Sequence, residues 1–164
     1  MASPRDIRKL ALLAMFQLDV TKGEDHELVR GALDDVATLE EEGLHFIDQH
    51  TEFTTGEKNK AFALALGAYE ERDAADEVLG ELSKDWSVSR MPTVDRSILR
   101  LAHYEMTSVA GSEPKGIVNE AVELAKLFST ENSPGFVNAI LDKILKRVLA
   151  TNGAGSGAGT GEGA

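Results

Sequence analysis

The sequence predicts an all-α fold, a helical bundle of six to seven helices arranged in two subdomains. Apolar residues recur along most of the chain at the three- and four-residue intervals of a helix. Ser, Thr, Asp and Pro stand where helices would begin, and no stretch shows the alternation of a half-buried strand. With 164 residues, of which 42% are apolar, the chain is long enough to bury a core.

The first helix is expected to run from Ser3 to about Asp19. A capping serine, a proline at the first helical position and an acid three residues after the serine favour this start. A second helix is expected from Asp25 through Val36, before Gly43 breaks the pattern. The buried stripe of the first helix is predicted to be Ile7, Leu10, Ala11, Ala14 and Leu18.

Two helices are expected in the middle of the chain. Thr54 and Glu57 form a capping-box pattern, which leads into apolar residues at helical spacing. Asp73 can cap the next helix, which is expected to end near Trp86.

Three further helices are expected towards the C-terminus. A proline break precedes Thr93, which is a possible cap for the first of them. Pro114 opens the second, and Ser133 is expected to cap the third, whose apolar stripe continues to Val148.

The loop before Thr93 is the expected seam between two subdomains of one helical domain, residues 1–150. The N-terminal subdomain would span about 1–88 and the C-terminal subdomain about 89–150. Beyond them, glycine occupies every second position from Gly153 to Gly163. Such a segment has nothing to bury, so residues 151–164 are expected to form a disordered Gly-rich tail.

The net charge of −11 is distributed unevenly. Residues 1–18 carry +2, residues 19–85 carry −13, residues 86–150 carry +1 and the tail carries −1. Because charges are screened beyond roughly 8 Å at physiological salt, basic groups at one end can act locally despite the acidic middle. The middle segment is interpreted as solvated helix faces, which leaves open whether it binds another partner.

Several classes of protein are disfavoured by composition. No stretch approaches the roughly 20 apolar residues of a membrane helix, and the first residues lack the apolar core of a secretory signal. The chain has no cysteine, and its four histidines show no spacing suited to zinc. No nucleophile or nucleotide motif is present. We therefore expect a cytoplasmic protein without membrane contact, metal, cofactor or catalytic residues.

The first helix carries a candidate site for single-stranded RNA. Arg5, Arg8, Lys9, Leu12 and Phe16 fall within one sector, opposite the predicted buried stripe. Cations can meet phosphates, and a ring can stack on an unpaired base. The alternative is that the two apolar members pack under a neighbouring helix while the cations only solubilise its start.

Two later helix starts offer weaker candidates for RNA contact. Lys115 begins one predicted helix, and Asn132, Ser133 and Phe136 begin the next. Free backbone N–H groups at a helix start favour phosphate, and Phe136 adds a ring. These residues would lie close together if the last two helices pack antiparallel. The alternative is ordinary capping with a core phenylalanine.

Three phrases between Arg90 and Leu145 carry a family resemblance. They read RMPTVDRSILRLAHYEM, PKGIVNEAVELAK and SPGFVNAILDKIL, in this order and with short connections. Together they resemble the C-terminal half of the transcription antitermination factor NusB family. The resemblance extends over nearly the whole chain and is strongest from Leu82 to Ile144.

The resemblance implies a function in transcription antitermination of rRNA operons. Family members hold a single-stranded RNA element, boxA, with an arginine-rich start of the first helix and a later aromatic residue. Arg5, Arg8 and Phe16 match those positions, although Asp6 interrupts the cluster and Phe16 replaces the usual Tyr. RNA affinity of this chain alone is therefore expected to be weak.

The resemblance also implies protein partners. In the family, the helix that here follows Thr93 belongs to the surface that receives NusE, a small-subunit ribosomal protein, and the joint complex acts on the RNA polymerase elongation complex. Arg96 and Arg100 lie four residues apart and are expected to share an exposed edge, which by itself would be only a solvated face. With Asp95 they are the candidate contacts for NusE.

Two other functions are kept as alternatives. The same helical module, fused to rRNA methyltransferases, binds RNA for an enzyme, but this chain has no room for a catalytic domain. A protein-only adaptor or homodimer would instead bury the basic face of the first helix and never touch RNA. In that case, neutralising Arg5 and Arg8 would change oligomer size rather than RNA retention.

Overall fold

The computed structural model describes residues 3–34, 52–83 and 87–162, and in this part of the chain every regular element is helical. The all-α prediction is therefore confirmed. No helix among the described residues is long and apolar enough to cross a membrane. The elements are α1 Pro4–Val20, α2 His26–Asp34, α4 Thr55–Glu70, α5 Arg72–Leu82, the short 3-10 helix η1 Val88–Arg90, α6 Thr93–Ser108, α7 Pro114–Phe128 and α8 Ser133–Glu162.

Two helix starts follow their sequence signals closely. The Ser3 hydroxyl caps α1 by accepting a hydrogen bond from the Asp6 N–H, and the Asp6 carboxylate accepts one from the Ser3 N–H. Thr54 and Glu57 make the same reciprocal pair before α4. Each pair satisfies two backbone N–H donors within four residues, which is why the local sequence pattern is enough to predict it.

Three other boundaries differ from expectation. Helix α5 begins at Arg72 without a side-chain cap and ends at Leu82, and Trp86 lies outside the described residues. Thr93 is already helical, because Pro92 occupies the cap position of α6. Ser133 is likewise the first residue of α8, and its hydroxyl bonds to Asp95 of α6 instead of capping its own helix. In the last case a tertiary contact overrides the local signal.

The core consists of two clusters of buried side chains. One lies among α1, α2 and α4, and the other among α5, α6, α7 and α8. Helix α1 takes part in both clusters, because its Leu12 packs in the second one. Helix α6 does so as well, because its Leu101 packs in the first one. The division into two subdomains at the loop before Thr93 stays a prediction, since Leu79 from the N-terminal side also belongs to the second cluster.

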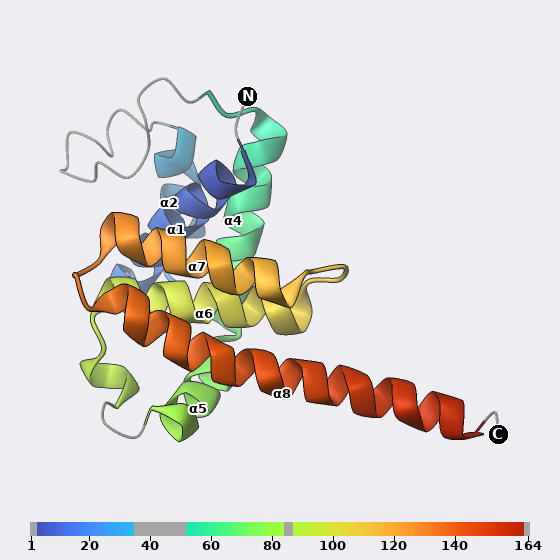
Figure 1. Cartoon of the computed structure of the whole chain (residues 1–164). Coiled ribbons are helices and arrows are strands. Elements are labelled where there is room, and N and C mark those ends of the chain that lie inside the picture. Colours follow the sequence, from blue (N-terminus) through green and yellow to red (C-terminus); the bar gives the residue numbers. More distant parts are fainter. Residues whose placement is uncertain (1–2, 35–51, 84–86, 163–164) are drawn as a thin grey trace.

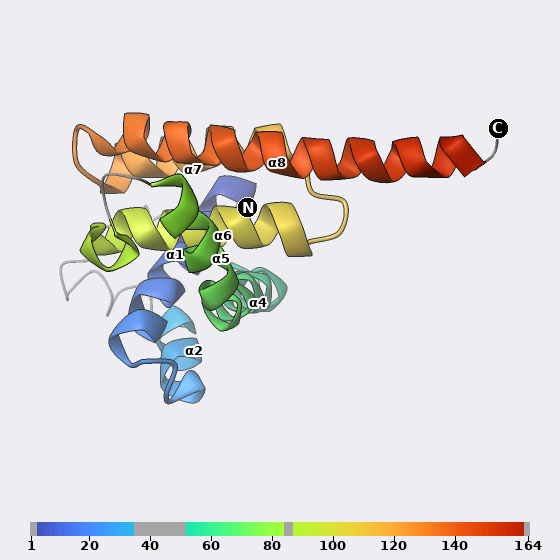
Figure 2. The ribbon, with the colours of Figure 1, turned by 90° about the horizontal axis from the view of Figure 1, so that it is seen from below.

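Helix α6 is the centre of the arrangement. It lies between the α7–α8 hairpin and the group of α1, α2 and α4 (Figures 1 and 2). Its approach to α4 requires a glycine, because a Cβ atom at Gly67 would come within 2.3 Å of the Tyr104 ring and hydroxyl. Ten residues of α6 are buried, including several charged and polar ones, so its polar side chains must find partners inside the protein.

Helix α8 continues well past the rest of the bundle. Its C-terminal half projects away from the other helices (Figure 1). The helix reaches Glu162, which differs from the disordered tail expected over residues 151–164. Propagating an existing helix adds a hydrogen bond for each residue fixed, and this favours continuation, whereas the glycine content that led to the expectation opposes it.

Candidate nucleic-acid interface

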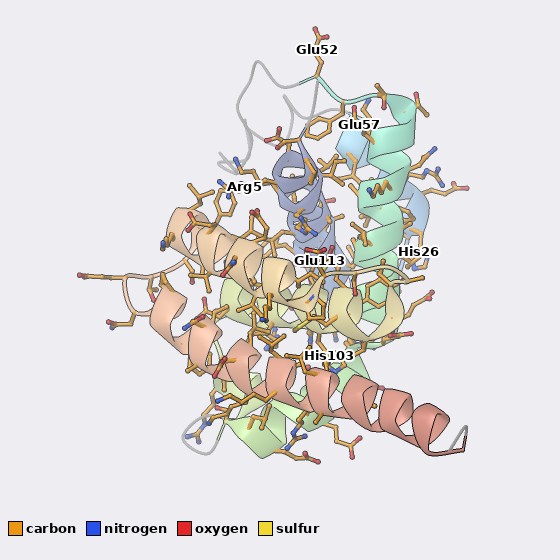
Figure 3. All side chains as sticks on the ribbon, turned by 45° about the vertical axis from the view of Figure 1, so that its right-hand side comes forward. Arg5, His26, Glu52, Glu57, His103 and Glu113 are labelled. Carbon is orange, nitrogen blue, oxygen red and sulfur yellow. The ribbon has the colours of Figure 1, made fainter. Side chains whose placement is uncertain are left out.

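The first turn of α1 faces the middle of α7 through an ion pair. Arg5 donates from Nε to Glu120 Oε2 at 2.8 Å and from Nη2 to Glu120 Oε1 at 3.0 Å. The Arg5 side chain remains 44% exposed and that of Glu120 remains 27% exposed. Figure 3 labels Arg5 beside the start of α1. The hydrogen bond from Arg5, helped by its charge, lowers the pKa of the Glu120 carboxyl. The pair is therefore charged and open to solvent.

One turn further along α1, Arg8 is held more deeply. Its Nε lies 3.1 Å from both carboxylate oxygens of Glu105 on α6, and its Nη2 lies 3.1 Å from Oε1. Glu105 is buried, and the Arg8 side chain is only 21% exposed. Arg8 therefore binds α1 to α6, and a ligand could reach it only at its edge.

The remaining members of the predicted strip do not continue it. Lys9 is partly buried, with its Nζ 4.0 Å from Asp6 Oδ1. Leu12 is buried in the second core cluster, and Phe16 is half-buried at the contact of α1 with Val94 and Ser97 of α6. The alternative reading of packing under a neighbouring helix is correct for Leu12, because α1 is covered on two sides. The exposed part of the strip is its N-terminal end.

A groove of about 410 Å³ runs beside this end of α1. Its walls come from α1, α4, the end of α6, the loop after it and the start of α7. Charges of both signs line it, including Arg8, Lys60, Glu105, Glu113 and Glu120. The groove is therefore a mixed electrostatic surface rather than a basic channel.

The structure separates two sets of residues that we expected to meet. Helices α7 and α8 form a hairpin in which the end of α7 leads into the start of α8 (Figure 1). Lys115 in the first turn of α7 consequently lies at the opposite end of that helix from Asn132, about 20 Å away for 15 residues at 1.5 Å each. Antiparallel packing brings the start of one helix to the end of the other, so the expectation was wrong.

Lys115 instead stands on the same helix end as the groove beside α1. It is exposed, and no hydrogen bond or ion pair to it is found among the described residues. Its neighbours Glu113 and Gly116 line that groove. Lys115 therefore adds an exposed cation near the groove, at the start of α7.

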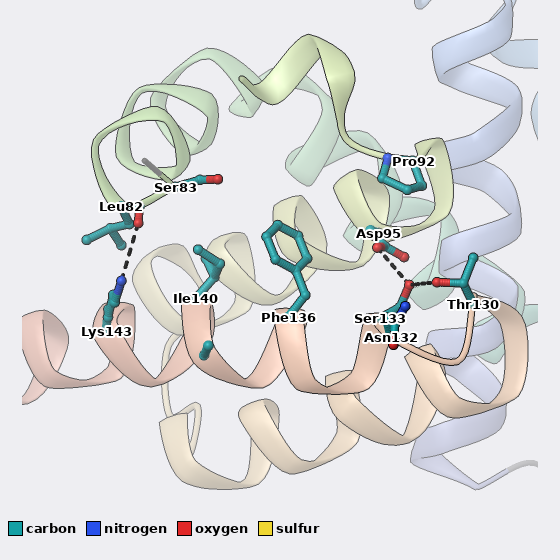
Figure 4. Close-up of a pocket in the computed structure, with 11 residues that line it drawn as sticks. Leu82, Ser83, Pro92, Asp95, Thr130, Asn132, Ser133, Phe136, Ile140 and Lys143 are labelled. Atoms are coloured by element: carbon teal, nitrogen blue, oxygen red, sulfur yellow. Dashed lines mark hydrogen bonds between the residues drawn. The ribbon is translucent and has the colours of Figure 1, made fainter. Parts of the chain in front are cut away.

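A second and larger pocket, of about 610 Å³, lies between α5, the start of α6 and α8. Phe136 and Ile140 of α8 provide an apolar wall, and Lys143 donates to the backbone carbonyl of Leu82 across it (Figure 4). Asn132 lies at its rim and is exposed. The pocket is wide enough for a planar ring.

A network of hydroxyl groups around one carboxylate forms the polar end of this pocket. Ser133 donates to Asp95 Oδ2 at 2.8 Å, and Ser129 donates to Asp95 Oδ1. The Thr130 hydroxyl lies 2.7 Å from the Ser133 hydroxyl (Figure 4). The Ser129 hydroxyl lies 2.8 Å from the same group. Asp95 and Ser133 are both buried, so this network fixes the α7–α8 turn on α6.

The exposed edge predicted on α6 is not present. Arg100 is 7% exposed and bonds to Asp76 at 2.8 and 2.6 Å, while its Nη1 lies 3.5 Å from Asp19. Arg96 donates to Asp19 at 2.8 Å and is 17% exposed in its side chain. Burial disfavours the charge on Arg100, but the hydrogen bond and charge of Asp76, together with Asp19, outweigh it and raise the pKa of Arg100.

The structure adds residues that sequence reasoning did not select. Glu105 and Glu120 contact the two arginines of α1, and Lys60 and Lys143 line the two pockets. The ion-pair partners are 97 and 115 residues apart, so no local pattern could have found them. Among the described residues, no group of three His, Cys, Asp or Glu side chains is placed to hold a metal ion.

Comparison with known proteins gives a consistent result. A model of the NusB family matches residues 5–146. The transcription antitermination protein NusB of Trichlorobacter lovleyi is 36% identical over 142 residues, which cover 85% of this chain and 88% of that protein. The solved structure of T. maritima NusB has a TM-score of 0.67 and 31% identity, and the match covers 89% of this chain and 93% of that one.

A further solved structure, of antitermination factors NusB and NusE in complex with dsRNA, has a TM-score of 0.66. Its sequence identity to this chain is 23%, and the match covers 87% of this chain and 96% of that one. At this identity the likeness shows a shared fold.

Proposed function

This chain belongs to the NusB family, and from that premise we propose that it is a transcription antitermination factor that binds boxA-like single-stranded RNA together with the ribosomal protein NusE. In this proposal it works in the cytoplasm, on the RNA polymerase elongation complex of rRNA operons, and catalyses no reaction itself. Its task is to join an RNA segment to a protein partner.

The observation that carries the proposal is the exposed guanidinium of Arg5, which pairs with Glu120 in the wall of the mixed groove. The Arg5 Nη1 has no hydrogen-bond partner among the described residues and can meet a phosphate. Lys115 lies at the same end of the bundle and adds a second exposed cation. Arg8 and Lys9 contribute charge at the edge of this face.

We assign a second RNA contact to the larger pocket. Phe136 offers a ring on which an unpaired base can stack, for about 1 to 3 kcal/mol, and Asn132 at the rim offers amide groups to a base edge. Ser133 shapes this pocket through its bond to Asp95. Phe16, half-buried at the α1–α6 contact, presents only its exposed edge to a strand.

NusE is proposed to dock beside the start of α6. Asp95, Arg96 and Arg100 support that surface by holding α6 against the α7–α8 turn, α1 and α5, since their polar atoms are engaged inside the protein. A structural neighbour of this chain has been solved as a complex of NusB, NusE and dsRNA, which supports a bipartite assembly. When the RNA contact and the NusE contact form on one transcript, the first binding event raises the local concentration of the partner for the second.

Titrating a boxA-containing RNA with and without NusE, at two salt concentrations, tests the proposal. We expect weak binding by this chain alone, tighter binding with NusE, and an affinity that falls by roughly 0.7 log units per log unit of salt for each phosphate neutralised. A flat salt response in both titrations would rule out the cationic face as the contact surface.

One observation supports the rival function of a protein-only adaptor or homodimer. Arg5 and Arg8 are both paired with carboxylates of the same chain, so each guanidinium already has a counter-ion without RNA. That rival predicts that neutralising both arginines changes the oligomeric mass in light scattering and leaves RNA retention unchanged. The antitermination proposal predicts reduced RNA retention at constant mass.

A further inference from the structure

We propose that Glu120 sets the RNA affinity of this protein, because its carboxylate occupies the Arg5 guanidinium edge that an RNA phosphate would take and must be displaced for RNA to bind. This inference rests on the proposed function and adds a regulatory residue to it. Glu120 lies in the phrase PKGIVNEAVELAK, but it is not among the candidate site residues predicted from the sequence.

The geometry places the carboxylate where a phosphate would bind. Arg5 uses Nε and Nη2 in a two-pronged contact with the two oxygens of Glu120, at 2.8 and 3.0 Å. The same fork suits two phosphate oxygens, so carboxylate and phosphate compete for one edge. A phosphate approaching Arg5 meets either this occupied edge or the single free Nη1.

The charges around Arg5 reinforce the competition. Asp6, Glu120 and Glu123 all act on its guanidinium, and the first turns of α1 offer only Arg8 and Lys9 as further cations. Arg8 is itself neutralised by Glu105. The basic strip is therefore balanced by acids from α6 and α7 in the free protein. A phosphate gains little from long-range attraction and must exchange directly with a carboxylate.

Exchange is feasible at Arg5 and not at Arg8. The Arg5 and Glu120 side chains are 44% and 27% exposed, so water can solvate both groups when they separate. Glu105 is 9% exposed in its side chain, and separating it from Arg8 would leave a buried charge without a partner. Arg8 is accordingly a positioning residue, and Arg5 is the cation that changes partners.

The exchange makes RNA binding depend on additional contacts. Once displaced, Glu120 is an ordinary exposed glutamate, which is charged at neutral pH, so it repels the RNA and offsets part of the new Arg5–phosphate attraction. RNA of any sequence meets this same cost. Only an RNA strand that also makes contacts elsewhere, at Phe136 or with docked NusE, offsets the free-energy cost of displacing Glu120. Glu120 thereby keeps the isolated protein from retaining RNA indiscriminately.

Glu120→Gln tests this inference, with Glu123→Gln as the matched control. Both substitutions remove one negative charge from α7, but Glu123 bonds to Lys126 and not to Arg5. A boxA-containing RNA and a scrambled RNA of the same composition are titrated into the full chain without NusE. We expect Glu120→Gln to tighten binding of both RNAs by about two- to fivefold over the control variant. We also expect its salt dependence to steepen by about 0.7, because one more phosphate is neutralised without competition.

A double substitution separates competition from a general charge effect. If Glu120 acts by occupying Arg5, then adding Glu120→Gln to Arg5→Gln produces no more gain than Glu123→Gln does. Thermal unfolding of each variant shows that the fold is retained, and Glu120→Ala serves as a second variant if the glutamine keeps a hydrogen bond to Arg5.

Two outcomes overturn the inference in different ways. Equal affinities and salt slopes for the Glu120→Gln and Glu123→Gln variants, in a protein whose RNA binding still depends on Arg5, reject the role of Glu120 and leave the proposed function standing. Absence of RNA binding by the wild-type chain and all variants, with and without NusE, rejects the proposed function and this inference together.

Discussion

The two arginine pairs of this protein, Arg5 with Arg8 on α1 and Arg96 with Arg100 on α6, have similar sequence spacing and different environments. On α1, Arg5 pairs with Glu120 at the surface and stays 44% exposed, whereas Arg8 is 21% exposed and pairs with the buried Glu105. On α6, Arg100 is buried and is held by aspartates from α1 and α5. Arg5 can exchange its partner, whereas Arg8 stays bound to α6, and the two arginines of α6 join that helix to α1 and α5.

Helical spacing therefore predicts which residues share a face of a helix, but it does not predict whether another helix packs over that face. Arg96 and Arg100 share one side of α6 as the spacing requires, but α1 and α5 pack over that side with Asp19 and Asp76. Arg5 lies in the first turn of its helix, where its ion-pair partner among the described residues is Glu120 of α7. The position of an arginine in the bundle therefore decides whether its guanidinium can bind a ligand or only joins helices.

The largest expected effect is a loss of stability at the buried pair. Arg100→Met leaves Asp76 without its partner in a partly buried site, and we expect the free energy of unfolding to fall by about 2 to 4 kcal/mol. The thermal midpoint should fall by roughly 5 to 12 °C. Arg147→Met is the control, because its pair with Glu81 is about half exposed. Similar midpoints for the two variants would show that burial does not distinguish these arginines.

A smaller loss is expected at the carboxylate that fixes the α7–α8 turn. Asp95→Asn keeps the side-chain shape but replaces one charged acceptor oxygen with an NH₂ group facing the Ser129 or Ser133 hydroxyl. We expect about 1 to 2 kcal/mol less stability in urea unfolding. Asp142→Asn, at an exposed pair with Lys146, should change stability by less than about 0.5 kcal/mol. If both variants unfold alike, the network does not hold the turn.

The smallest effect concerns a second buried polar group of α6. Burial lowers the pKa of His103, and the charge of the nearby Glu71 opposes this shift. Within the described part of the chain, the His103 Nδ1 has no hydrogen-bond partner. Below the ordinary value of 6.5, the unfolded chain takes up a proton that the folded chain resists. Stability is therefore complete above pH 6.5 and falls as the pH drops from there towards the folded pKa.

His103→Leu should remove that part of the pH dependence. The slope contributed by one proton is at most about 1.4 kcal/mol per pH unit. Urea unfolding of the two proteins between pH 7.5 and 5.5 measures it, and the same substitution at the exposed His26 controls for the loss of a histidine. Parallel curves for wild type and His103→Leu would contradict this reading of α6.

Features set by neighbouring residues could be predicted from the sequence. Both capping boxes, the proline start of α7 and the helical class follow from patterns within one or two turns. Ser133 shows the limit, since its hydroxyl serves Asp95, 38 residues away, rather than its own helix. The partners of Arg5 and Arg8 are more distant still. The packing of α1 on α6 and α7 determines these partners. The sequence therefore predicted which cations lie on α1, but not that carboxylates of the same chain pair with them.

The most direct test of the central claim follows the arginine side chains while RNA binds. The Nε–Hε signals of Arg5, Arg96 and Arg100 can be recorded by NMR in labelled protein titrated with boxA-containing RNA and NusE. We expect the Arg5 signal to shift as its guanidinium exchanges Glu120 for phosphate, while the Arg96 and Arg100 signals keep their positions. An unchanged Arg5 signal at saturating RNA, or a shift confined to Arg96 and Arg100, would contradict this expectation.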